Sequence, residues 1–122
     1  LENSYYFNDY LNFDLVWNTG IGFGLLSQSS ILLYNLISII IGFVIFFLIY
    51  FVFFKKIREK FIFSIIIGGA IGNFYDRMVF KAVPDFIDLH YKDFHWFTFN
   101  IADVFITIGI ATYIIIGVAE KK

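Results

Sequence analysis

The sequence predicts an integral membrane protein, mainly α-helical, in a single membrane-embedded domain over residues 1–122. Sixty per cent of the residues are apolar and 23% are aromatic, whereas soluble domains are roughly 45–50% apolar. The mean hydropathy is +0.80, and long apolar runs continue without a charged residue. A chain of this length cannot hide so much apolar surface in one small core, so membrane lipid is an expected partner.

Composition also excludes several classes of function. The chain has no cysteine, which rules out disulfides, thiol nucleophiles and thiolate metal sites. Lysine and arginine are few and do not alternate with aromatic residues along a polar face, so we expect no nucleic-acid partner. Any chemistry must therefore rest on carboxylates, the two histidines, hydroxyls or amides.

Three apolar stretches are predicted to cross the membrane as helices, at about 31–54, 61–79 and 97–118. The first contains no charge, and at about 1.5 Å per residue it is long enough for a hydrocarbon layer of about 30 Å. Four positive charges follow it within residues 55–60, and short connections of this kind stay on the cytoplasmic side. Together with the two C-terminal lysines, these residues put six of the nine Lys and Arg residues on the cytoplasmic side. In this orientation, residues 80–96 form an extracytoplasmic loop.

The remaining segments complete this topology. Residues 1–30 mix polar and aromatic types and include a strand-like piece at 13–17, so we expect a layer on the outer membrane surface. Gly68 and Gly72 form a small-xxx-small pair that would let another helix approach. Because three spans leave residue 1 outside, a fourth, N-terminal span is expected upstream of this sequence.

Polar side chains from separate parts of the chain meet at the outer boundary in this topology: Asn73, Asp76, Asp85, Asn100 and Asp103. Two carboxylates in a poorly hydrated site cannot both ionise easily, so one keeps a proton. Such a pair can take a proton from water that attacks an amide carbonyl and give one to the departing nitrogen. We expect Asp85 and Asp103 to be this pair.

Neighbouring polar residues are expected to support the acids. Asn73 and Asn100 can orient the pair or the scissile carbonyl, since an amide offers a donor and an acceptor without a charge. Arg77 is expected to reach another carboxylate or the loop backbone and so secure the loop that carries Asp85.

Two other interpretations remain open at this point. Residues 85–95 contain Asp85, Asp88, His90, Asp93 and His95, which could serve a metal-dependent membrane hydrolase or a cation carrier, although their spacing matches no established ligand pattern. Alternatively, the outer polar residues only anchor the helices of a non-enzymatic scaffold.

Four motifs resemble one family. They are NTGIGFG at 18–24 (pattern NxGxxF), GGAIGNFYDR at 68–77 (GGaxGNxxDR), VPDFID at 83–88 (VxDFxD) and FNIAD at 99–103 (FNxAD). In this order they are similar to the lipoprotein signal peptidases, the bacterial signal peptidase II family of membrane aspartic peptidases.

The resemblance implies a four-helix membrane aspartic endopeptidase with a small extracytoplasmic β-rich cradle at 1–30. It implies a multi-pass protein of the bacterial cytoplasmic (inner) membrane, with its active site at the extracytoplasmic face. The substrate would be a diacylglyceryl-modified prolipoprotein, cut just before the lipidated cysteine. We expect a monomer that needs no metal or other cofactor.

The same motifs assign residues. Asp85 and Asp103 match the catalytic positions. The supporting or substrate-binding positions are Asn18, Gly20, Phe23, Asn73, Asp76, Arg77, Asn100 and Ala102.

The sequence departs from the family pattern in two ways. The family's first helix, which carries an acidic residue and a lysine, is absent from this sequence, so the activity of this chain alone depends on whether that helix is dispensable. Pro84 stands where the family usually has an aliphatic residue. Because proline fixes φ and removes one donor, we expect it to stiffen the loop and leave the site intact.

Overall fold

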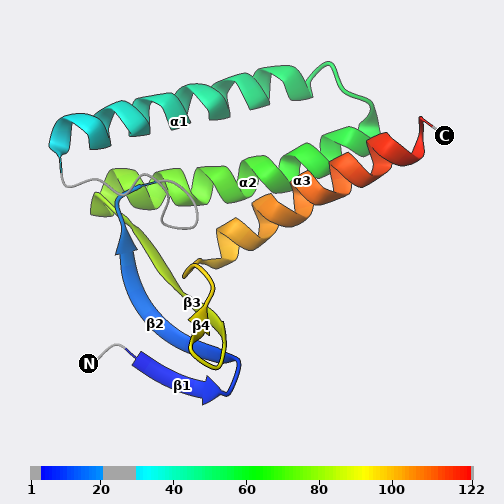
Figure 1. Ribbon diagram of the computed structural model, residues 1–122. Coiled ribbons are helices and arrows are strands. Elements are labelled where there is room, and N and C mark those ends of the chain that lie inside the picture. The colour runs from blue at the N-terminus through cyan, green and yellow to red at the C-terminus, as the bar shows by residue number, and fades with distance from the viewer. Residues whose placement is uncertain (1–3, 21–29, 122) are drawn as a thin grey trace.

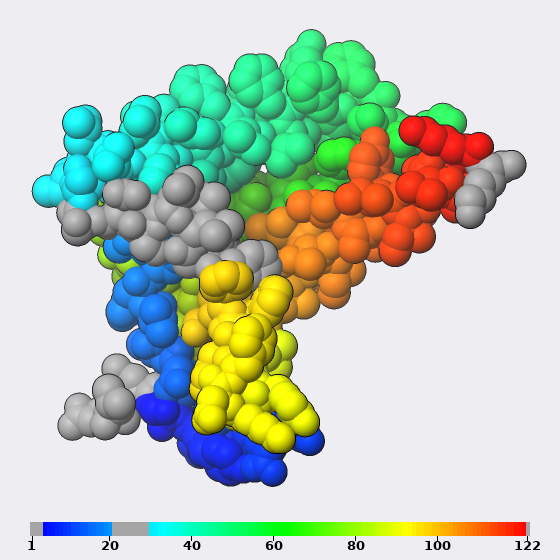
Figure 2. Space-filling view, in the orientation of Figure 1, coloured from blue at the N-terminus to red at the C-terminus, as the bar shows by residue number. Residues whose placement is uncertain are grey.

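Three helices and a four-stranded antiparallel sheet make up the computed structural model, which describes residues 4–20 and 30–121. The helices are α1 (Ile31–Val52), α2 (Ile57–Phe80) and α3 (Ile101–Ala119). The strands, in spatial order, are β1 (Ser4–Asn8), β2 (Leu11–Asn18), β3 (Val83–Tyr91) and β4 (Phe94–His95). Figure 1 shows the sheet at the end of the bundle where α2 ends and α3 begins, and in Figure 2 it projects as a separate lobe.

Two of these helices, α1 and α3, are long and apolar enough to cross a membrane. Their apolar side chains are exposed around most of the circumference, as at Phe43, Phe47 and Ile115, which is typical of helices that face lipid. The helix α2 has 24 residues but carries charges near both ends. The chain therefore has the apolar helices and small antiparallel sheet of a membrane protein, and the count of three spans stays a prediction.

The predicted outer loop 80–96 is largely strand rather than irregular chain. Lys81 adopts a left-handed conformation (φ 61°) that ends α2, and β3 begins two residues later. β3 pairs with β2 on one side and with β4 on the other. The surface layer expected from residues 1–30 alone is thus completed by residues 83–95, whose polarity had suggested a loop. The third helix begins at Ile101 rather than Phe97, because Phe99 still bridges to Ile87 of the sheet.

The contact between α2 and α3 is closest at two glycines. A Cβ on Gly69 would lie 2.7 Å from the Ala102 carbonyl oxygen and 2.8 Å from Ile106 Cγ1, and a Cβ on Gly109 would overlap Ile66. By contrast, a Cβ on Gly68 would have nothing within 4 Å. The close approach expected at Gly68 and Gly72 is therefore made one residue further along the helix, at Gly69.

This difference gives a prediction about stability. Gly69→Ala should lower the midpoint of thermal unfolding in detergent micelles, because overpacking a close contact costs about 1–3 kcal/mol. Gly68→Ala should leave the midpoint unchanged or raise it, since alanine is the better helix former by roughly 0.5–1 kcal/mol and its methyl group meets open space. Equal midpoints for the two variants would contradict the packing described here.

Candidate active site

The elements that carry most of the buried polar side chains meet where the sheet joins the bundle (Figure 1). Asn18 is the last residue of β2, Asp85 belongs to β3, and Asn73 lies in the outer part of α2. Asn100 is the N-cap of α3, and Asp103 lies in its first turn. Four elements thus each bring at least one polar side chain to a single place.

Asp85 is the most buried large side chain among the described residues, with 2% of its surface exposed. Its Oδ2 accepts a hydrogen bond from Asn18 Nδ2 (3.0 Å) and its Oδ1 accepts one from Asn100 Nδ2 (2.8 Å). β3 holds it there by pairing with β2, in which Val16 is the register partner of Asp85. The carboxyl group is thus satisfied by two neutral amides and is kept from bulk water.

Asp103 is held by a reciprocal cap at the start of α3. Its backbone N–H donates to Asn100 Oδ1 (3.1 Å), and its own Oδ2 accepts from the Asn100 backbone N–H (3.1 Å). An Asn at the N-cap followed by an acid three residues later is the local pattern that produces this capping box. Asp103 Oδ1 accepts a further hydrogen bond from Asn73 Nδ2 (2.9 Å).

Two asparagines link the two acids. Asn100 Nδ2 donates both to Asp85 Oδ1 and to Asn73 Oδ1 (2.9 Å), and Asn73 Nδ2 donates in turn to Asp103. A continuous hydrogen-bond network therefore runs from one carboxyl group to the other.

Both carboxyl groups also line one cavity of about 220 Å³. Its other walls are Asn18, Ile41, Ala70, Asn73, Phe74, Arg77, Val83, Ile106 and Thr107. Most of this wall is apolar. The two acids therefore face a space of low polarity that has room for water and a substrate backbone.

Burial raises the pKa of Asp85 to about 6, from an ordinary value of 3.8. The negative charge of Asp103 raises this pKa further, while the hydrogen bonds from Asn18 and Asn100 lower it in part. Asp85 can therefore hold a proton much closer to neutral pH than an exposed carboxyl group does.

The raised pKa predicts how stability depends on pH. Between 3.8 and about 6 the folded protein holds the Asp85 proton more tightly than the unfolded chain does, so the contribution of this group to stability falls as the pH rises through that window. The difference between the two pKa values corresponds to roughly 3 kcal/mol. From about pH 4 to about pH 7, the unfolding midpoint of the Asp85→Asn variant should rise relative to wild type.

An exposed acid on the same hairpin provides the control. Asp93 lies in the turn between β3 and β4, and Asp93→Asn should track the wild-type midpoint at both pH values. A constant difference between wild type and Asp85→Asn across this range would contradict the raised pKa.

Arg77 is buried, with 3% of its surface exposed, and it also lines the cavity. Its Nη1 donates to the Thr19 carbonyl oxygen at 3.5 Å, and the guanidinium carbon lies 5.3 Å from the centre of the Tyr34 ring. The Tyr34 hydroxyl donates to the Arg77 carbonyl oxygen (2.6 Å). Arg77 thus holds the backbone that follows Asn18, whereas we expected it to secure the segment that carries Asp85.

Tyr34 is a residue that sequence reasoning missed. It is buried near the start of α1, in a stretch that is mostly apolar and carries no charge. The signal that could have indicated it is a hydroxyl group in the first turn of a span, at the same depth as the outer polar residues of α2 and α3.

The other predicted site residues are divided between different places. The Gly20 backbone N–H donates to Asn18 Oδ1 (2.8 Å), which orients that amide toward Asp85. The Ala102 carbonyl faces Gly69 in the helix contact. Asp76 lines a separate groove of about 550 Å³, together with Pro84 and Ala102, and not the cavity of the two acids. Phe23 lies outside the described residues.

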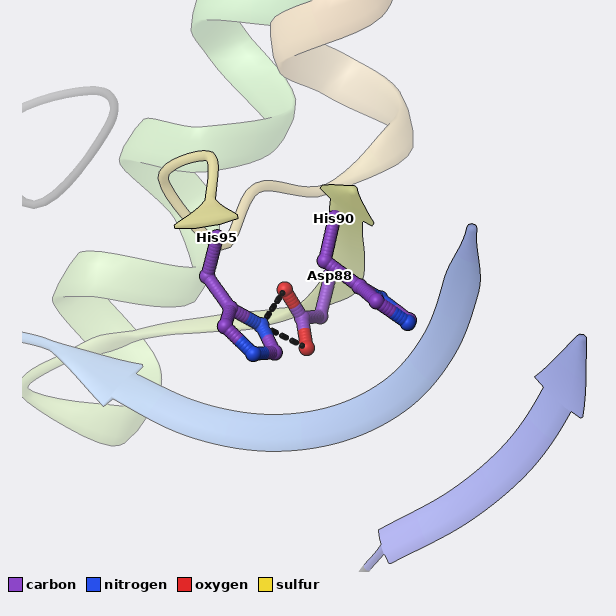
Figure 3. A group of neighbouring side chains, drawn as sticks. All are labelled: Asp88, His90 and His95. Atoms are coloured by element: carbon purple, nitrogen blue, oxygen red, sulfur yellow. Dashed lines mark hydrogen bonds and ion pairs between the residues drawn. The ribbon is translucent and has the colours of Figure 1, made fainter. Parts of the chain in front are cut away.

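The alternative metal-binding set is also divided. Asp85 belongs to the asparagine network, and Asp93 is exposed in a turn. Asp88, His90 and His95 form a separate group on β3 and β4 (Figure 3). The five residues considered for one metal site therefore lie in different places, and they do not form a single ligand set.

Comparison with known proteins adds independent information. A family model described as "Signal peptidase (SPase) II" matches residues 1–119. A lipoprotein signal peptidase from Pelagibacter ubique is 50% identical over 111 residues, which cover 91% of this chain and 67% of that protein. Another, from Thermodesulfovibrio yellowstonii, is 42% identical over 106 residues, or 86% of this chain and 69% of that protein.

Solved structures give the same result at the level of the fold. A bacterial membrane enzyme determined by the in meso method at 2.3 Å resolution superposes with a TM-score of 0.77 at 32% sequence identity. The superposition covers 98% of this chain and 73% of that one.

Proposed function

The chain belongs to the signal peptidase II family, and from this premise we propose that it is an aspartic endopeptidase of the membrane. Its substrate is a diacylglyceryl-modified prolipoprotein, from which it removes the signal peptide just before the lipidated cysteine. Asp85 and Asp103 are the catalytic acids, and water is the nucleophile.

One observation carries the assignment of the acids. Asp85 and Asp103 are 2% and 5% exposed, line the same cavity, and are joined through Asn100 and Asn73. A buried carboxyl group is costly to a fold unless it is paired or used. Here two carboxyl groups face one cavity, and each accepts hydrogen bonds from neutral amides rather than from a cation. Together they can supply an acid and a base to a substrate bound in that cavity.

The environments of the two groups suggest different roles. Asp103 accepts hydrogen bonds from a side chain and from a backbone N–H at the start of a helix, where the helix dipole favours a negative charge. Asp85, whose pKa is raised to about 6, is the group that more readily holds a proton. We assign Asp103 as the base and Asp85 as the acid in the first step.

The reaction then balances without a covalent intermediate on the enzyme. Asp103 takes a proton from water as the water oxygen bonds to the scissile carbonyl carbon, and the carbonyl oxygen takes the negative charge. The carbon–nitrogen bond breaks as that charge re-forms the carbonyl, and Asp85 gives its proton to the departing nitrogen. Release of the new carboxyl and amine, with transfer of the proton that Asp103 took from water to Asp85, restores the starting state.

The position of the site suits a lipid-anchored substrate. The basic segment 55–60 between α1 and α2 lies at the opposite end of the bundle from β3 and the start of α3 (Figure 1), and by the positive-inside rule this supports a site at the extracytoplasmic face of the inner membrane. Acyl chains and an apolar signal helix would both hold the scissile bond near that depth. We propose that the protein acts as a monomer.

Cleavage of a diacylglyceryl-modified precursor in detergent micelles, followed by a gel shift, tests this function. The product should begin at the lipidated cysteine, as mass spectrometry of the released signal peptide will show, and a chelator should have no effect. The same precursor without the diacylglyceryl group is the matched control and should be cleaved far more slowly. Equal cleavage of both precursors, or a product cut elsewhere, would overturn the proposal.

A further inference from the structure

Three metal-ligating side chains lie on one face of the β3–β4 hairpin (Figure 3). Asp88 and His90 are two residues apart on β3 and so project to the same face. His95 of β4 is the register partner of His90, which places it on that face as well. The two imidazole rings stack with their centres 4.9 Å apart, and His95 Nδ1 lies 2.9 Å from Asp88 Oδ2.

Two polar atoms beside this group are buried without a partner. They are His90 Nδ1 and Asn12 Oδ1, and in the described part of the chain they are the buried side-chain nitrogen and oxygen atoms that lack a hydrogen bond. Asn12 is the register partner of Asp88 on β2. An unsatisfied buried polar atom destabilises the fold, and both of these occur on residues next to the same buried carboxylate, that of Asp88.

We propose that Asp88, His90 and His95 bind a divalent transition-metal ion, with Zn²⁺ as the reference case. Two imidazole nitrogens and one carboxylate oxygen form a donor set that Zn²⁺ accepts readily, with water completing the coordination. Asp88 supplies the negative charge and is itself only 4% exposed. The ion takes the place of the proton shared between His95 Nδ1 and Asp88, and it gives His90 the partner that it lacks.

The donor atoms of Asp88, His90 and His95 need only small movements to coordinate one metal ion. One donor atom from each residue lies within 4.8 Å of the others. Ligands about 2.0–2.1 Å from a tetrahedral ion are roughly 3.4 Å apart, so the widest pair of donor atoms must approach by about 1.4 Å at most, and His95 Nδ1 and Asp88 Oδ2, now 2.9 Å apart, must separate by about 0.5 Å. The His95 side chain is 51% exposed, so its rotation can provide this movement.

This site is separate from the acid pair. Asp85 bonds to Asn18 and Asn100, while the metal ligands begin three residues further along β3 and bond to none of these groups in the described structure. A bound ion would join β4 to β3 and would stiffen the outer sheet without entering the hydrolytic reaction. The proposal therefore stands whether or not the acids have the function assigned to them above.

Metal titration of the full chain in detergent micelles tests this inference. Isothermal titration should show one saturable Zn²⁺ site per chain and no comparable site for Mg²⁺, a cation that prefers oxygen ligands. His90→Gln should weaken the Zn²⁺ affinity at least about tenfold, because even changes to residues behind a ligand cost roughly 10–100-fold. Asp93→Asn removes a carboxylate from the same hairpin and should bind Zn²⁺ as the wild type does.

A spectroscopic readout makes the test independent of small changes in folding. With Cu²⁺ as the probe, the nitrogen hyperfine pattern should indicate two imidazoles in the wild type and one in either His90→Gln or His95→Gln. The chain contains only these two histidines. The proposal is overturned if wild type shows no saturable Zn²⁺ binding, or if His90→Gln binds with unchanged affinity and an unchanged Cu²⁺ spectrum.

Discussion

Replacing either of the two acids proposed to be catalytic, Asp85 or Asp103, by asparagine will reduce cleavage of a diacylglyceryl-modified precursor by about 10²–10⁴-fold, the usual contribution of general acid–base groups. Asp85→Asn cannot donate a proton to the leaving nitrogen, and Asp103→Asn cannot accept one from water. Each change keeps the size of the side chain, so the cavity that both groups line is preserved. Initial rates from a gel-shift assay measure the effect.

The controls separate lost chemistry from lost structure. Asp93→Asn makes the same chemical change at an exposed turn and should cleave at the wild-type rate. The double variant Asp85→Asn/Asp103→Asn should be little slower than either single variant, because two groups that act as a unit are not additive. Full activity in either single variant, with the protein still in the membrane, would rule out the acid pair.

Asn100→Ser will lower the cleavage rate roughly tenfold to a hundredfold while keeping the N-cap of α3. Serine at the N-cap still accepts from the Asp103 backbone N–H, so α3 keeps its start. The variant lacks the Nδ2 donor that bonds both Asp85 and Asn73. An acceptor left unsatisfied costs about 1–3 kcal/mol. When this cost is added to the activation free energy of cleavage, the rate falls by roughly tenfold to a hundredfold.

Two further variants make this result specific. Asn100→Ala should show the same loss of activity and, in addition, a lower unfolding midpoint, because losing an N-cap costs about 1 kcal/mol. Asn35→Ser changes an exposed amide on α1 and should alter neither property. If Asn100→Ser cleaves at the wild-type rate, the bridge between the acids does not contribute to catalysis.

The place of the site could be predicted from the sequence because its residues are anomalous. Asn73, Asn100 and Asp103 stand next to long apolar runs, and the direction of each span brings them to one end of the bundle. The structure places these three with Asp85 around one network. Polar groups in apolar sequence are informative because each must be satisfied where it is buried.

The details of pairing could not be predicted in the same way. Polarity suggested a loop around Asp85, but the register with β2 that buries it depends on contacts 67 residues away in sequence, such as that with Asn18. Arg77 was expected to reach a carboxylate or the backbone of the loop that carries Asp85, whereas it bonds to the Thr19 carbonyl and lies over Tyr34.

The rotation of α2 about its own axis was a second feature that could not be predicted from the sequence. The pattern of small residues showed that α2 approaches another helix, but Gly68 and Gly69 differ by about 100° around the helix axis. Only the packed structure shows that Gly69 meets α3. Asp76 illustrates the same limit, since Asn73 lines both the cavity and the groove, whereas Asp76, three residues later, lines only the groove.

The glycine contact between α2 and α3 makes the alignment of the two acids depend on how closely these helices pack within the bilayer. Gly69 lies one helical turn from Asn73, and its neighbour in the contact, Ala102, immediately precedes Asp103. The spacing of the two helix axes thus fixes the length of the Asn73–Asp103 hydrogen bond. Lateral pressure from the surrounding acyl chains acts on that spacing, so thickness and tension of the membrane bear directly on the alignment of the acids.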